Sequence, residues 1–108
     1  SQTKFFGMIG EAYVPFVRAQ VEMTLGRFEN AVAEAEKASL IDYSNVEVAR
    51  VVNTVKIVAR ARSRGNDLFG HGKFSEACSA YGEGLKYDSS NYVLFCNRAV
   101  CWSKLGLW

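Results

Sequence analysis

The chain has 108 residues, of which 49% are hydrophobic and 22% charged, and its net charge is +2. This composition is typical of one soluble globular domain or a piece of one. It excludes the strongly basic class of nucleic-acid-binding chains, and no run approaches the ~18 apolar residues of a membrane span.

Three cysteines, Cys78, Cys96 and Cys101, form an odd set whose spacing suits neither a disulfide framework nor a zinc ribbon. A reducing compartment fits this usage, so we expect a cytoplasmic location. We predict buried or half-buried structural thiols, with no catalytic residue, no metal and no cofactor. His71 lies at a predicted turn, where exposure is expected. A thiol-based redox or enzymatic module is the alternative, and a depressed cysteine pKa would favour it.

Hydrophobic periodicity, glycines and turn signals predict five helices. Their approximate ranges are 14–25, 29–40, 46–70, 75–87 and 92–105. Pro15 is expected in the first turn of its helix, where its missing N–H is tolerated. Residues 1–12 stay open, because Phe5, Phe6, Met8 and Ile9 are apolar enough to pack while Gly7 and Gly10 weaken a helix.

The third of these helices is predicted to be unusually long. Valines recur at three- and four-residue steps from Val48 to Val58, and neither glycine nor proline interrupts the pattern before Gly65. Ser44 with Glu47 three residues later resembles a capping box at its start. We therefore expect one helix of about 25 residues, about 37 Å long at 1.5 Å per residue.

A pattern repeats along the chain around Gly26, Gly72 and Gly106. Each glycine is followed two residues later by an aromatic, and the first two frames continue to a small residue and an Asp-x-Ser-Asn ending. The aromatics are Phe28, Phe74 and Trp108. The equivalent small residues are Ala31 and Ala77, followed seven residues later by Ala38 and Gly84, and the Asp-x-Ser-Asn endings are residues 42–45 and 88–91. The glycines suit a positive φ at a helix end, and the small residues suit close helix packing. Gly72 and Gly106 are 34 residues apart, the period of a helix-turn-helix repeat.

These residues resemble the tetratricopeptide repeat (TPR), in which antiparallel helix pairs stack into a superhelix. The resemblance implies an all-α fold and a single TPR domain fragment over residues 1–108. Repeat one covers about 12–45, a helical extension about 46–57, repeat two about 58–91, and the first helix of repeat three about 92–106. Tyr43 and Ser89 stand where the family often has proline, and Glu22 where it often has an aromatic.

Within the family, Arg62 with Asn66 and the run Asn97-Arg98-Ala99 resemble the carboxylate-clamp co-chaperones. Those domains bind the Glu-Glu-Val-Asp C-terminal tails of the seventy- and ninety-kilodalton heat-shock proteins, and Arg62 takes the place usually held by lysine. The resemblance implies that Arg62, Asn66 and Asn97 bind peptide carboxylates. The alternative is that they line a groove without a ligand. The family's two further basic residues come from a third inner helix that this chain does not reach, so we expect weak binding.

The extension and the run from Ala61 to Phe69 are most similar to plant TPR thioredoxin-like proteins. That resemblance implies a protein-binding module in a stress or hormone signalling scaffold, without enzymatic activity. The TPR repeats of a J-domain co-chaperone are the alternative within the family. Because the sequence lacks an initiator Met and ends abruptly, we expect a segment of a longer protein.

Two surfaces remain to be interpreted. Lys56, Arg60 and Arg64 lie four residues apart on one helix face, but no aromatic residues are interleaved with them, so we predict a solvated face and no nucleic-acid partner. The helix 92–105 lacks a partner, and Val93, Val100 and Trp102 are candidates for exposure. We therefore expect self-association through this helix, by exchange of helices.

Overall fold

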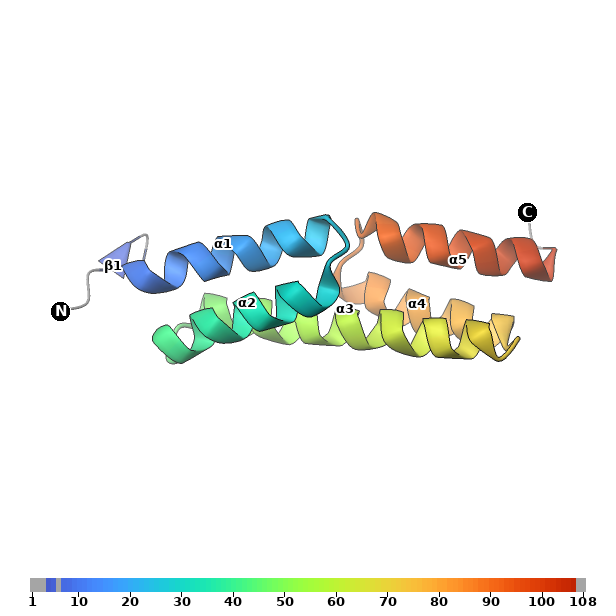
Figure 1. Cartoon of the computed structure of the whole chain (residues 1–108), viewed down its shortest axis with the longest axis horizontal. Helices are drawn as coiled ribbons and strands as arrows, with labels where there is room; N and C mark the ends of the chain where they lie inside the picture. The colour runs from blue at the N-terminus through green and yellow to red at the C-terminus, as the bar shows by residue number, and fades with distance from the viewer. Residues whose placement is uncertain (1–3, 6, 107–108) are drawn as a thin grey trace. The chain divides into compact units, whose positions relative to one another are not determined.

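The computed structural model describes residues 4–5 and 7–106, with side chains from residue 7 onward. The described part is all-α apart from one short hairpin (Figure 1). Its elements are β1 (Lys4–Phe5), β2 (Met8–Ile9), α1 (Gly10–Thr24), α2 (Phe28–Ile41), α3 (Val46–Gly70), α4 (Phe74–Tyr87) and α5 (Tyr92–Leu105). No helix among these residues is both long and apolar enough to cross a membrane.

The chain forms two compact units, residues 1–56 and 57–108, and α3 contributes to both. The five helices confirm the predicted TPR-like architecture, and the 25-residue α3 has the predicted bounds. The continuity of α3 follows from its sequence, because neither glycine nor proline occurs in it before Gly65.

The N-terminal end differs from the prediction. Strands β1 and β2 pair antiparallel, with Lys4 opposite Ile9 and Phe5 opposite Met8, and α1 begins at Gly10. Pro15 is therefore the sixth residue of α1, so its predicted place in the first turn is wrong. The early start is explained by packing, because α1 buries both Ala12 and Pro15. Phe6 lies outside the described residues.

The core of the first unit joins the hairpin, α1, α2 and the start of α3. It is formed by Met8, Ala12, Ala38 and Val48, with Phe16, Ile41 and Val52 packed against it. Helices α1 and α2 pack against each other. The buried face of α2 is mainly alanine, which lets the two backbones approach closely, as the small residues predicted.

The three repeated glycines have the positive φ that the sequence predicts: 79° at Gly26, 75° at Gly72 and 74° at Gly106. The aromatic that follows fills space at the first two turns. Phe28 is fully buried, and Phe74 meets Phe69 edge to face with ring centroids 5.0 Å apart. Trp108, the aromatic of the third frame, lies outside the described residues.

The Asp-x-Ser-Asn endings are helix caps. Asn45 Oδ1 accepts the Val48 N–H at 3.1 Å, and Asn45 Nδ2 donates to Asp42 Oδ2 at 3.1 Å. The same two bonds, with the same lengths, join Asn91 to Leu94 and Asp88. Asn45 directly precedes α3, so the predicted capping role of Ser44 is wrong: Ser44 is exposed and lies one residue too early.

The first of these caps also holds the hairpin. The buried carboxylate of Asp42 accepts the Ile9 N–H at 2.9 Å, and Asn45 Nδ2 donates to the Gly7 carbonyl at 3.0 Å. One Asp–Asn pair therefore caps α3 and anchors the turn between β1 and β2.

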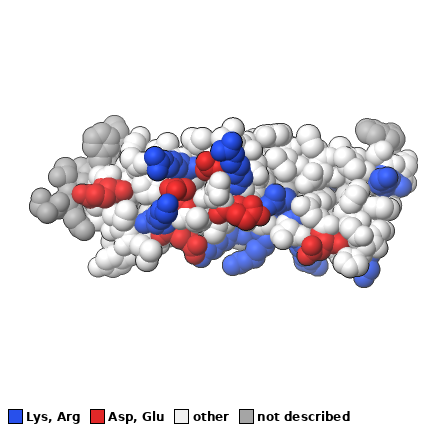
Figure 2. Space-filling view, in the orientation of Figure 1, with Lys and Arg blue, Asp and Glu red and all other residues white. Residues whose placement is uncertain are grey.

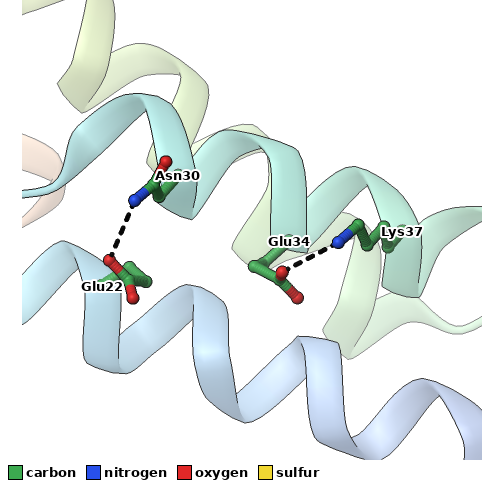
Figure 3. Close-up of polar contacts among 4 residues, drawn as sticks. All are labelled: Glu22, Asn30, Glu34 and Lys37. Atoms are coloured by element: carbon green, nitrogen blue, oxygen red, sulfur yellow. Dashed lines mark hydrogen bonds and ion pairs between the residues drawn. The ribbon is translucent and has the colours of Figure 1, made fainter.

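Charged side chains of both signs are interspersed on the face seen in Figure 2. On α2, Lys37 donates to Glu34 at 3.0 Å, and Asn30 donates to Glu22 of α1 at 3.5 Å (Figure 3). The basic face of α3 is partly neutralised from another helix, since Lys56 Nζ lies 3.2 Å from Glu36 Oε2 of α2. The sequence did not predict this ion pair, because its partners are distant in the chain.

Candidate functional site

The candidate site is built in the second unit, where α4 packs on the end of α3. A Cβ placed on Gly65 would lie 2.3 Å from Tyr81 Cε1, 2.5 Å from Cδ1 and 2.7 Å from Cζ. The Tyr81 ring therefore lies directly on the backbone of α3, and only glycine leaves room for it. Tyr81 as a whole is 2% exposed.

This packing brings the Tyr81 hydroxyl to Asn66, the residue after Gly65. The hydroxyl donates to Asn66 Oδ1 at 2.6 Å. Because the bond occupies the carbonyl side of the amide, the Nδ2 group with its two N–H donors points to the other side. Asn66 itself is an exposed residue.

Arg62 lies one helical turn before Asn66 on α3 and is half-buried. Its charge acts on Tyr81. Burial raises the pKa of the Tyr81 phenol above its usual value of 10, the neighbouring Cys101 thiol adds to this, and the positive charge of Arg62 opposes it. Tyr81 is therefore protonated at neutral pH and remains a hydrogen-bond donor.

Helix α4 also contacts α5, at Gly84. A Cβ placed on Gly84 would lie 2.8 Å from the Ala61 Cβ of α3 and 2.7 Å from Leu94 Cδ1 of α5. The close approach predicted from the small residues is therefore present on both sides of this glycine. Gly84 of α4 thus packs against both α3, which carries Arg62 and Asn66, and α5, which carries Asn97.

Asn97 is half-buried on α5. Of the three predicted site residues, Asn66 has the hydrogen bond to Tyr81. The carboxylate-binding role of these three residues stays a prediction.

The next residue, Arg98, packs on two aromatic rings of α5. Its guanidinium carbon lies 5.3 Å from the Phe95 ring centroid and 4.6 Å from that of Trp102. Trp102 and Val100 are exposed as predicted, whereas Val93 is half-buried. The expected self-association through α5 stays a prediction.

The cysteines differ from one another in their surroundings. Cys101 is fully buried and Cys78 half-buried, as predicted, whereas Cys96 is exposed, so its predicted burial is wrong. Cys96 lies two residues after Leu94, on the side of α5 away from the core. Burial, together with the neighbouring Cys78, raises the pKa of Cys101 to about 11, which is the opposite of an activated thiol.

No metal site is found among the residues that the structure describes, because no three His, Cys, Asp or Glu side chains there lie close enough to share an ion. His71 is exposed, as predicted, and its Nδ1 lies 2.7 Å from the Asp67 carbonyl oxygen.

Tyr81 and Gly65 are the site residues that the sequence analysis missed. A signal was present, since a glycine inside a helix costs about 1 kcal/mol relative to alanine and indicates a close neighbour. The identity of that neighbour depends on the packing of α4.

Known proteins resemble this chain over most of its length. The inactive TPR repeat-containing thioredoxin TTL3 of Arabidopsis thaliana is 64% identical over 107 residues, which is 99% of the chain. The TPR repeat-containing thioredoxin TTL4 of the same plant is 59% identical over 97% of the chain. The chain is a close homologue of these TPR proteins. It spans 16% of the length of each.

This TPR segment has more distant relatives as well. Hsp70-Hsp90 organizing protein 3 of Arabidopsis thaliana is 27% identical over 90% of the chain, and the chain spans 19% of that protein. Hsp70-Hsp90 organizing protein 1 of Glycine max is 39% identical over 47% of the chain, which is 9% of that protein. No family model and no solved structure matches the chain. The homologues and the TPR-like fold together support a protein-interaction TPR module.

Proposed function

We propose that this TPR segment is a non-enzymatic module that binds the acidic C-terminal tail of a chaperone through Arg62, Asn66 and Asn97. The observation that carries the proposal is the hydrogen bond from Tyr81 to Asn66 Oδ1, since it leaves the N–H₂ side of this exposed amide for a ligand. The relatives named Hsp70-Hsp90 organizing proteins support a chaperone of the seventy- or ninety-kilodalton class as the partner. Three free cysteines support a cytoplasmic location.

The chemistry of the ligand follows from the donors. A C-terminal residue with an acidic side chain carries two carboxylates, which only accept hydrogen bonds. The Arg62 guanidinium and the Asn66 amide on successive turns of α3 supply donors and no competing negative charge. Hydrogen bonds to charged groups contribute about 1.5 to 3 kcal/mol each.

Titration of the chain with a synthetic peptide ending in Glu-Glu-Val-Asp tests the proposal. Arg62→Ala is expected to weaken binding by about 10- to 150-fold, the equivalent of one charge-assisted interaction. Asn66→Asp keeps an acceptor for Tyr81 but places a carboxylate against the tail, so it should abolish detectable binding.

Two controls accompany this titration. Arg60→Ala removes an exposed arginine from the same helix and should leave the affinity unchanged. The same peptide with an amidated C-terminus should bind more weakly to the unaltered chain. Equal affinity for the two peptides, or equal effects of Arg62→Ala and Arg60→Ala, would contradict the proposed function.

A further inference from the structure

The further inference concerns Tyr81, which contacts the candidate site from another helix. Its ring is packed on the bare backbone at Gly65, where a Cβ would come within 2.3 Å of it. Its hydroxyl is thereby placed 2.6 Å from Asn66 Oδ1. Tyr81 is 2% exposed, so packing restricts where its hydroxyl can reach.

An asparagine on a helix surface can rotate its amide and present either oxygen or nitrogen to a ligand. The two faces have opposite chemistry, since the oxygen repels a carboxylate and the N–H₂ group donates to it. A phenol that donates to the oxygen selects one of these orientations. The printed contact that selects an orientation of this amide is the one from the Tyr81 hydroxyl to Asn66 Oδ1.

We infer that Tyr81 is a positioning residue for carboxylate recognition: its hydroxyl holds the Asn66 amide with the N–H₂ donors toward the bound tail. This inference rests on the proposed function. It assigns a role in specificity to Tyr81, which is not one of the three residues proposed to bind the tail. Gly65 is needed for the same positioning, because its lack of a Cβ lets the Tyr81 ring approach the backbone of α3.

Tyr81→Phe is the direct test, because it removes the hydroxyl and keeps the ring that packs on Gly65. Affinity for the Glu-Glu-Val-Asp peptide should fall roughly twofold to tenfold, as expected for the loss of one neutral hydrogen bond. The preference for the free over the amidated C-terminus should fall with it. Tyr87→Phe is the matched control, because Tyr87 ends the same helix and is exposed.

A double-mutant cycle with Asn66→Ala separates positioning from a general structural effect. In the Asn66→Ala background, Tyr81→Phe should cause no further loss, because the amide it orients is gone. An equal loss in both backgrounds would overturn the inference, as would unchanged affinity of Tyr81→Phe when Asn66→Ala alone weakens binding. In either of these results the proposed function stands if Arg62→Ala still reduces affinity.

A third result would act on both proposals. If Arg62→Ala and Asn66→Ala leave the discrimination between free and amidated peptide unchanged, the proposed function fails, and the role of Tyr81 fails with it. Circular dichroism of each variant confirms that the helices are retained.

Discussion

Gly65→Ala offers a sharp test of the packing on which the site depends. In a helix interior this change normally stabilises by about 1 kcal/mol, because alanine has the higher helix propensity. Here the added Cβ would meet three carbons of the Tyr81 ring at 2.3, 2.5 and 2.7 Å. Carbon atoms normally approach to about 3.5 to 4.0 Å, so the ring must withdraw by about 1 Å.

The expected magnitude follows from the surroundings of the ring. Overpacking of a buried site costs about 1 to 3 kcal/mol, and the upper end applies because the Tyr81 ring is almost fully buried. Subtracting about 1 kcal/mol of helix propensity leaves a net loss of about 2 kcal/mol. If the ring's withdrawal also breaks the bond to Asn66, about 1 kcal/mol more is lost.

Urea unfolding followed by tryptophan fluorescence measures this loss, because both tryptophans lie in residues 57–108. Gly70→Ala is the matched control on the same helix, since a Cβ there has no atom within 4 Å. It should leave stability unchanged or raise it by up to about 1 kcal/mol.

The sign of the effect should depend on Tyr81. In a Tyr81→Ala background the obstacle is absent, so Gly65→Ala should stabilise the chain rather than destabilise it. A Gly65→Ala variant that is as stable as the unaltered chain, with Tyr81 present, would refute the close packing of the ring on α3.

Two further predictions concern the caps and the buried thiol. Asn91→Ala should lower the free energy of unfolding by about 1 kcal/mol through loss of the α5 cap. Asn45→Ala should lower it by more, because Asn45 also donates a hydrogen bond to the Gly7 carbonyl. Thermal unfolding compares the two variants, and an equal loss would contradict the anchoring role of Asn45. Cys101 has a raised pKa of about 11, so the folded chain keeps a proton that the unfolded chain releases near pH 9. The contribution of Cys101 to stability should therefore be constant below pH 9 and be lost between about pH 9 and 11, and Cys101→Ala should flatten this part of a pH series of urea unfolding curves.

Much of the local structure could be predicted because its causes are local. Helix periodicity, the absence of breakers from Val46 to Gly65, and the positive-φ glycines act within a few residues of themselves. The repeated Asp-x-Ser-Asn endings were visible too, although the capping residue was assigned to Ser44 instead of Asn45. The error places the cap of α3 one residue too early, and helix ends are the part of a helix that sequence signals define least well.

Errors of another kind arose where distant segments meet. The β1–β2 hairpin is held by Asp42, more than thirty residues away in the chain, so its own sequence left residues 1–12 open. The ion pair between Lys56 and Glu36 likewise joins two helices. The exposure of Cys96 depends on which face of α5 packs against α4.

The sequence by itself determined the helices, the turns and the pair Arg62 and Asn66, because helix spacing alone places residues four apart on one face. Only the tertiary structure decided that Asn66 is held with its oxygen occupied. That orientation requires the Tyr81 ring to lie on Gly65, a contact between residues sixteen apart in sequence and on different helices. A glycine in a helix indicates that something comes close, but only the packed fold shows which side chain it is.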